Sequence, residues 1–383
     1  MTGYLVRRLI QIIITFLAFL TLVFFLVQAQ PGDFASFYAT NPKIPPESRQ
    51  QIAASFGLKD PIWKQYFRYV GNFFTGDLGT SFAHYPRQVV SILIERAPRT
   101  ILLFVTATVV SFYFGFALGK LIAWYRGRTL EYVSTIGGVY LYTVFTPWFG
   151  LLMIWLFAFK AGWFPMGKFL DPLLWRTATV DANYVFHRMI ATAAAFGIFA
   201  FVVAFIGRRL HWKYSTPLVF SVLLAGVGFT LLGWVLGGIG YLAWDIIRHM
   251  VLPVLVLTLI SFAGTMLLMR NSMLETMRED YILTARAKGL PEKVVRDRHA
   301  ARNALLPVIT SFVFSLAFAI DGGVITETIF SWPGMGLTLL DAAVMQDMPL
   351  AVGAFVFTGV FALVAHVVAD VLYAFLDPRI RYQ

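Results

Sequence analysis

The sequence predicts an all-α polytopic membrane protein, and three observations lead to that class. Of the 383 residues, 58% are hydrophobic and only 13% are charged, which is too little charge to cover a soluble domain of this length. The apolar residues form long continuous runs rather than the alternating pattern of a barrel strand. Inside a bilayer, only helices or closed barrels satisfy every backbone hydrogen bond. Helices that cross the membrane many times are therefore the predicted architecture.

A spanning helix needs about 20 apolar residues to cross the hydrocarbon core. Scanning at that length predicts eight spans: Leu9–Ala29, Thr100–Ile122, Val133–Phe159, Met189–Gly207, Thr216–Leu236, Val251–Met269, Leu306–Phe330 and Leu350–Phe375. The first run follows two arginines and is too long for the apolar region of a signal peptide, so we expect it to be a true span.

The basic residues predict that both termini lie in the cytoplasm. Short cytoplasmic loops are enriched in Lys and Arg, and this orientation places most of the basic loop residues inside: Arg126, Arg128, Arg208, Arg209, Lys213, the run from Arg270 to Arg302, Arg379 and Arg381. The net charge of +11 therefore needs no nucleic acid to explain it.

The spans divide the chain into five parts. Residues 1–29 hold the first span, and residues 30–99 form an extracytoplasmic segment, which is either a cap that contacts a partner or the pore mouth, or a structured loop. Residues 100–168 hold spans two and three, residues 169–248 hold spans four and five, and residues 249–383 hold the last three spans.

The most polar stretch of the chain is the loop 270–305, between spans six and seven. Gly289 can take the left-handed conformation that closes a helix, and Pro291 suits the start of a new one. The loop is therefore predicted to be a helix, a sharp turn and a second helix that ends near Asn303.

The centre of this loop combines small residues with cations. Ala285, Ala287 and Gly289 would let the backbone of a partner approach closely, and Arg286 and Lys288 can meet carboxylates on that partner. A solvated positive-inside loop is the plainer interpretation. The length of the loop and its ordered helix signals favour a docking element.

Several motifs resemble one family. TARAKGLPEKVV (284–295) and RHAARNALLPVIT (298–310) are similar to the cytoplasmic EAA loop of ABC-importer permeases of the dipeptide, oligopeptide and nickel branch. Leu283, Thr284 and Ala285 stand at the Glu-Ala-Ala positions of that motif, and Gly289 stands at its glycine. Six further segments are similar to the same branch: QAQPGD (28–33), GLKDPIWKQYFRYVGNFFTGDLGTSF (57–82), RAPRTILLF (96–104), GWFPMG (162–167), TETIFSWPGMG (326–336) and DVLYAFLDPRIRYQ (370–383).

The resemblance implies a permease subunit of an ATP-driven importer in the cell inner membrane, which forms half of a path for peptides or a related small solute. Its implied partners are a second homologous permease, two cytoplasmic ABC ATPase subunits, an extracytoplasmic substrate-binding protein and membrane lipid. ATP and Mg²⁺ would be bound by the ATPase subunits, and this chain is expected to hold no cofactor and no metal. The family usually has six spans, so residues 169–248 look like an insertion of two helices.

The resemblance also implies which residues couple the chain to an ATPase: Tyr281, Thr284, Ala285, Arg286, Ala287, Lys288, Gly289 and Leu290. A second candidate site is Asp321 with Gly322 and Gly323, because a carboxylate inside a span usually faces the bundle interior or a water-filled path. The alternative role for these three residues is a helix break or helix packing.

No catalytic residue is predicted. GWFPMGKF (162–169) lacks the Ser or Thr of a phosphate-binding loop, and the six histidines are scattered without a metal-ligand spacing. An ion-coupled secondary transporter is the alternative function, although such a protein is expected to show two matching halves, and none is visible here.

Overall fold

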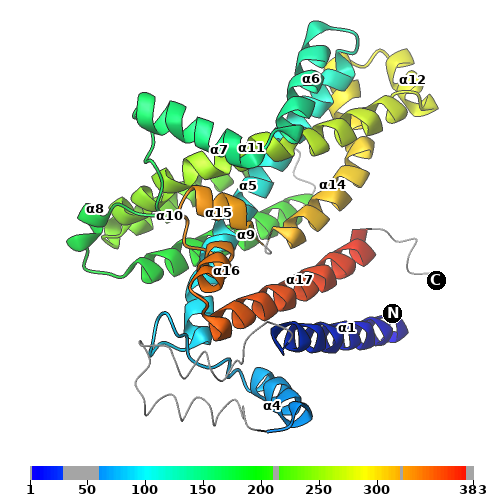
Figure 1. Ribbon diagram of the computed structural model, residues 1–383. Helices are drawn as coiled ribbons and strands as arrows, with labels where there is room; N and C mark the ends of the chain where they lie inside the picture. The colour runs from blue at the N-terminus through cyan, green and yellow to red at the C-terminus, as the bar shows by residue number, and fades with distance from the viewer. Residues whose placement is uncertain (1, 29–59, 210–214, 320–321, 377–383) are drawn as a thin grey trace.

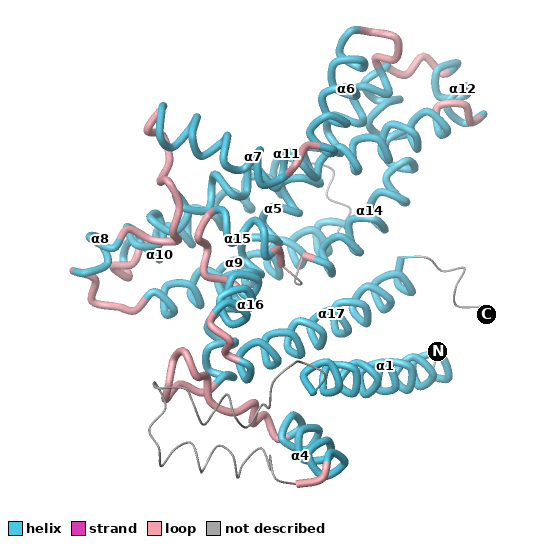
Figure 2. The backbone as a smooth tube through the Cα atoms, in the orientation of Figure 1, coloured by secondary structure: helices cyan, strands magenta, loops and turns pink. Residues whose placement is uncertain are grey.

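The computed structural model describes residues 2–28, 60–209, 215–319 and 322–376, and it is built from helices (Figures 1 and 2). These are α1 (Thr2–Gln28), α4 (Ile62–Phe74), α5 (Val89–Trp124), α6 (Thr129–Thr143), α7 (Thr146–Met153), the π-helix η1 (Ile154–Lys160), α8 (Pro172–Arg176), α9 (Ala182–Arg209), α10 (Ser215–Leu236), α11 (Gly240–Thr276), α12 (Asp280–Ala287), α13 (Glu292–Val294), the π-helix η2 (Val295–Ala300), α14 (Ala301–Phe318), α15 (Val324–Ile329), α16 (Met335–Val344) and α17 (Met348–Leu376). Over the described ranges, no β-strand forms beyond one isolated bridge between Thr80 and Gln88.

Each of the eight predicted runs overlaps at least one helix. Among the described residues, four helical stretches are long and apolar enough to cross a membrane: α5, Ala182–Val203 in α9, α11, and Met348–Val367 in α17. A bent pair of helices makes a fifth candidate. The polytopic helical class is therefore confirmed, whereas the count of eight spans stays a prediction.

The bent pair replaces the single helix predicted over Val133–Phe159. There, α6 ends at Thr143 and α7 starts at Thr146, and the two parts are bent by 106°. Pro147 lies in the first turn of α7, where its missing N–H costs nothing, and the break itself is the extended backbone of Val144 and Phe145. The prediction of one continuous helix is therefore wrong here.

The seventh predicted run is also divided. Helix α14 covers its first part, and α15 begins only at Val324. Between them, Gly322 has a φ of +79°, a left-handed conformation that glycine adopts without steric cost. Asp321 lies outside the described residues.

The central contact of the fold joins the two longest helices, α5 and α11. A Cβ atom at Gly115 would lie 2.6 Å from the carbonyl oxygen of Phe262, and one at Gly119 would lie 2.5 Å from that of Met266. The glycines of the sequence GFALG (115–119) thus form a helix-packing face, as small residues four apart predict. The similar sequence GWVLG (233–237), at the end of α10, is different, because a Cβ at Gly233 would meet nothing within 4 Å.

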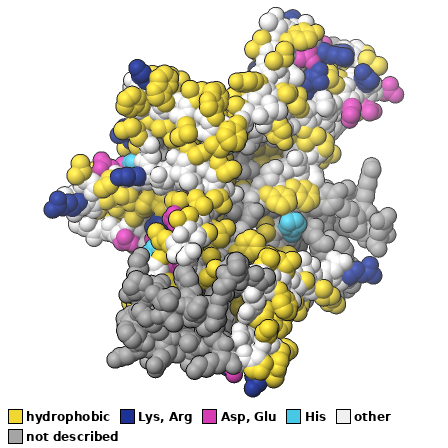
Figure 3. All heavy atoms as spheres, viewed as in Figure 1, with side chains coloured by type: hydrophobic (Ala, Val, Ile, Leu, Met, Phe, Trp, Pro, Cys, Tyr) yellow, Lys and Arg dark blue, Asp and Glu magenta, His cyan; other side chains and the backbone are white. Residues whose placement is uncertain are grey.

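Two of the groups of charged side chains on the visible surface lie at opposite sides of the bundle (Figure 3). One lies at the end of the molecule that carries α6 and α12, and the other lies in the region around α8, with a largely apolar surface between them. Helix α11 runs from the side of α8 to that of α12 (Figure 1). Such a separation is what a membrane-crossing bundle requires, because charges are excluded from its apolar middle.

Candidate functional site

The polar loop between α11 and α14 forms the predicted helix, turn and second helix. Helix α12 ends at Ala287, and Gly289 follows with a φ of +70°. Pro291 stands at the N-cap position of α13. The second helix does not end near Asn303 as predicted, because α13, η2 and α14 continue to Phe318. The turn is therefore joined directly to a helix of the bundle.

Apolar side chains pack α12 against the neighbouring helices of the bundle. Ile282 and Ala285 are 0% and 5% exposed, and they belong to a cluster with residues of α5, α11 and α14. The other buried members of this cluster are Ala123, Met269, Met273, Val295, Ala300, Ala301, Ala304 and Val308. Helix α12 is therefore joined by apolar packing to three helices of the bundle.

The predicted coupling residues do not all share one surface. Ala285 faces the buried cluster, whereas Ala287 and Gly289 are exposed. Residues two apart on a helix point to nearly opposite sides, so the expected small-residue face is divided. The other exposed members are Tyr281, Thr284, Arg286 and Lys288, and Leu290 is half-buried.

Three side-chain contacts hold the exposed side of the loop. The guanidinium of Arg286 lies 3.4 Å from the carboxylate of Glu292 and 5.7 Å from the ring centre of Trp124. The side-chain amide of Asn303 donates to the hydroxyl of Tyr281 at 2.7 Å. The contacts with Glu292 and Tyr281 cross the turn and stabilise its shape, and the contact with Trp124 joins α12 to the end of α5.

The buried carboxylate of Glu131 links α6 to the end of α11, where the loop begins. Glu131 accepts hydrogen bonds from Nε of Arg270 at 2.9 Å and from the backbone N–H of Gly127 at 2.7 Å. Glu131 is only 6% exposed. Sequence reasoning missed Glu131, and the available signal was its position in the first turn of a helix that follows a basic loop.

Asp297 is a second fixed carboxylate, on η2. Arg296 holds it with two hydrogen bonds of 2.9 and 3.0 Å, and Nζ of Lys120 lies 3.1 Å away. The hydrogen bonds from Arg296, with the nearby ammonium of Lys120, lower the pKa of Asp297 to about 2. The carboxylate therefore stays charged at any physiological pH and joins α5 to η2.

Of the predicted site in the seventh run, the structure describes Gly322 and Gly323, and both pack closely against α5. A Cβ at Gly322 would lie 2.6 Å from Cγ2 of Thr100, and one at Gly323 would lie 2.8 Å from the ring of Phe104. The two glycines therefore let the irregular segment approach α5 closely.

Glu327, which the sequence alone left without a role, is the centre of a buried network beside these glycines. It is 0% exposed and accepts hydrogen bonds from the hydroxyl of Thr100 at 2.7 Å and from the N–H of Leu337 at 2.9 Å. The Thr100 hydroxyl also accepts from the N–H of Met335 at 2.8 Å. Close by, the indole N–H of Trp332 donates to the backbone carbonyl of Arg99 at 3.1 Å.

Residues between 169 and 186 pack against Arg99 and Trp332, beside the network of Glu327. The guanidinium of Arg99 donates to Oδ1 of Asn183 at 2.7 Å and lies 4.5 Å from the ring centre of Phe169. The rings of Phe186 and Trp332 lie 6.0 Å apart, and both side chains are buried. The two predicted extra helices therefore have a specific anchor on the rest of the bundle.

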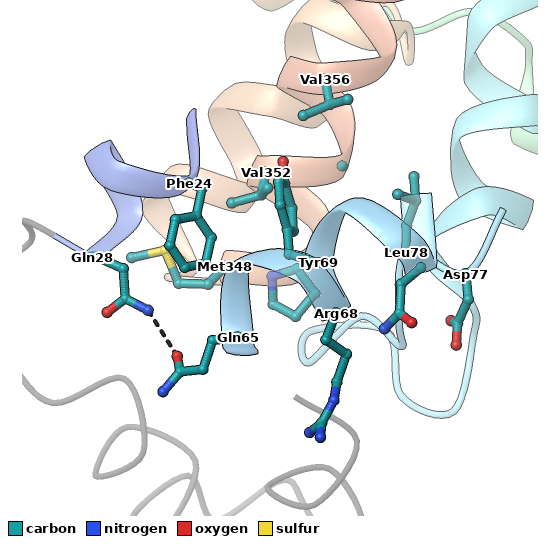
Figure 4. Close-up of a pocket in the computed structure, with 13 residues that line it drawn as sticks. Phe24, Gln28, Gln65, Arg68, Tyr69, Asp77, Leu78, Met348, Val352 and Val356 are labelled. Carbon is teal, nitrogen blue, oxygen red and sulfur yellow. Dashed lines mark hydrogen bonds between the residues drawn. The ribbon is translucent and has the colours of Figure 1, made fainter. Parts of the chain in front are cut away.

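A cavity between α1, α4 and α17 has a volume of about 90 Å³. Figure 4 shows Phe24, Tyr69 and Val352 around it, with the Gln28 amide donating to Gln65 at 2.9 Å. Ligand sites usually measure ~300–1,000 Å³, so this cavity is a packing gap rather than a substrate site.

Comparison with known proteins decides the family. Residues 115–382 match the family described as binding-protein-dependent transport system inner membrane component, and residues 1–104 match the N-terminal region of that membrane component. The chain belongs to this family. The permease is 31% identical over 382 residues to the oligopeptide transport system permease protein AppB of Bacillus subtilis, and each chain is covered completely.

Two further relatives also match over their full lengths. The permease is 30% identical to the di/tripeptide transport system permease protein DppB of Pseudomonas aeruginosa and 30% identical to the dipeptide transport system permease protein DppB of Escherichia coli. Family membership makes it a multi-pass inner membrane component of a transport system rather than an enzyme or an ion-coupled secondary transporter.

Proposed function

We propose that the permease forms half of the path of an ATP-driven importer for peptides. The observation that carries this proposal is the α12 turn, which exposes Ala287 and Gly289 while Ile282 and Ala285 anchor the helix in the bundle. The peptide class is inferred from relatives that are named for oligopeptide, dipeptide and di/tripeptide transport.

The proposed assembly contains a second homologous permease, two cytoplasmic ABC ATPase subunits and an extracytoplasmic substrate-binding protein. ATP and Mg²⁺ belong to the ATPase subunits in this proposal, and the permease itself holds no cofactor. We further propose that the chain crosses the membrane eight times, with both termini and loop 270–305 in the cytoplasm and residues 30–99 outside.

The exposed side of α12 would dock on an ATPase subunit. The contact would use Tyr281, Thr284, Arg286, Ala287, Lys288 and Gly289, with Leu290 at its edge, and Ala285 would support it from inside. Because α12 packs on the cytoplasmic ends of α5, α11 and α14, a shift of the ATPase would move these ends together. A rigid contact of this kind converts one discrete arrangement of the helices into another.

Asp321, Gly322 and Gly323 are proposed to lie at the path. The support is the chemistry of a carboxylate within a spanning run and the non-helical backbone at Gly322 and Gly323. Irregular backbone at membrane depth is tolerated where it lines a cavity or is buried in protein.

The test uses cross-linking from a single cysteine, because the chain has no natural one. With the whole complex in native membranes, Ala287→Cys is expected to cross-link to a co-purifying ATPase subunit. Ala285→Cys, two residues away and buried, is the matched control and should not react. Recovery of the permease without an ATPase, under conditions that preserve other transport complexes, would contradict the proposal.

A further inference from the structure

A basic groove of about 520 Å³ lies between the end of α5 and the start of the η2–α14 helix. It is lined by Phe116, Lys120, Asp297, Arg298, Ala301, Arg302 and Leu305. It differs from the exposed side of α12, because none of the proposed ATPase-coupling residues lines it.

The charges of the groove are unevenly compensated. Lys120 is paired with Asp297, which Arg296 also holds. Arg298 and Arg302 are exposed, and within the described part of the chain neither guanidinium has an ion pair or a hydrogen-bonded partner. Two like charges four residues apart along a helix repel each other. An anionic group between them would relieve this repulsion.

The apolar and the charged side chains of the groove lie at different depths. Phe116 lies one helical turn before Lys120 on α5, and Leu305 lies one turn after Ala301 on α14. On both helices these positions are closer to the apolar middle of the span than the cations are. The groove therefore presents cations at its rim and apolar side chains farther in.

We propose that this groove binds an anionic phospholipid of the cytoplasmic leaflet, with the phosphate at Arg298 and Arg302 and the start of an acyl chain against Phe116 and Leu305. Basic pockets between spanning helices on the cytoplasmic side suit anionic headgroups. An acidic segment of a protein would use the cations but not the apolar lining that continues toward the membrane. The proposal rests on the cytoplasmic orientation of the proposed function.

The experiment measures the phospholipid that stays with the full-length permease and its co-purifying partners. The Arg298→Gln/Arg302→Gln variant removes both free cations of the groove. The matched control, Arg278→Gln/Lys293→Gln, removes two exposed cations of the same loop that do not line the groove. Bound lipids are identified by native mass spectrometry, and binding is then measured with vesicles of phosphatidylglycerol or phosphatidylcholine.

Wild type and control are expected to retain anionic phospholipid, and the groove variant is expected to bind it about tenfold or more weakly. Phosphatidylcholine should show no such difference, and inorganic phosphate should not replace the lipid. Equal retention of anionic lipid by the groove variant would overturn the proposal. So would displacement by inorganic phosphate alone, or loss of a co-purifying protein with lipid unchanged.

Failure of the proposed function gives a different result. If no ATPase subunit co-purifies with wild type while lipid retention still depends on Arg298 and Arg302, the importer assembly is contradicted and the lipid site stands.

Discussion

At the scale of single residues, buried carboxylates hold the irregular parts of the permease in place. Glu327 joins α15 to Thr100 and to the start of α16. Asp347 accepts hydrogen bonds from the side chain of Ser81 and from the N–H of Ala83, so it joins the segment before α5 to the start of α17. In both places a carboxylate satisfies backbone donors that no helix can pair, which is the usual way to bury such donors.

Thr100→Val tests the network around Glu327. Valine has nearly the shape of threonine, but it removes the hydroxyl that donates to Glu327, which keeps its bond from Leu337, and it leaves the N–H of Met335 without a partner. We expect a loss of about 2–3 kcal/mol in the free energy of unfolding, seen as a lower unfolding temperature in detergent. Thr143→Val is the control, because the hydroxyl of Thr143 is exposed and bonds only within its own helix. Equal losses in both variants would contradict the role of the network.

The low pKa of Asp297 predicts how the loop responds to pH. The folded-state pKa of about 2 is below the unfolded value of about 4, so the carboxylate stabilises the folded loop above about pH 4 and loses this effect as the pH falls toward about 2. Asp297→Asn should lower the free energy of unfolding by roughly 1–2 kcal/mol. The difference in unfolding temperature from wild type should be the same at about pH 8 and about pH 5. A difference that shrinks over this interval would show that another group is responsible.

At the scale of helices, the backbone of the turn after α12 is set by one residue. Gly289 has a φ of +70°, and a Cβ there would meet nothing within 4 Å. Any effect of a substitution is therefore backbone strain or a change at the docking surface, not a clash inside the permease. Residues with a branched Cβ are disfavoured in this conformation, whereas asparagine tolerates it.

Gly289→Val and Gly289→Asn form a matched pair at this position. Valine is expected to destabilise the turn by about 1–2 kcal/mol, which should increase cleavage of loop 270–305 by protease and reduce transport. Asparagine should keep the protease resistance of wild type. If both variants keep that resistance and both lose transport, the glycine is needed for contact with the partner and not for the shape of the turn.

Helix α9, in the predicted insertion, is fixed to the bundle at one end. Phe186 on α9 is 1% exposed and belongs to the same buried cluster as Trp332. Farther along α9, the side chain of Phe201 is 71% exposed. The start of α9 is thus fixed to the bundle, and its later part presents an apolar surface suited to lipid.

At the scale of the whole molecule, the proposed orientation can be tested with single cysteines in a chain that has none of its own. Arg278 lies in the proposed cytoplasmic loop, and Leu173 lies in α8, on the proposed outer side, where it is 78% exposed. A membrane-impermeant thiol reagent applied to intact spheroplasts should label Leu173→Cys and should label Arg278→Cys only after permeabilisation. The reverse pattern would overturn the orientation of the permease and place α12 outside.

The sequence by itself determined the helical membrane class, the family, and the helix-turn-helix in loop 270–305. These features depend on local composition and spacing: apolar runs long enough for a bilayer, Gly289 and Pro291 as helix signals, and motifs in a fixed order. Tertiary structure alone decided that Ala285 faces inward, that residues 133–159 form two helices, and that the second helix of the loop continues to Phe318.

The sites that the sequence did not predict are built from residues far apart in the chain. Glu131 meets Arg270, Lys120 meets Asp297, and Thr100 meets Glu327. No spacing along one helix records such pairs, because each depends on how two separate helices pack. The groove between α5 and α14 has the same origin, since its cations and its apolar lining come together only when these helices lie side by side.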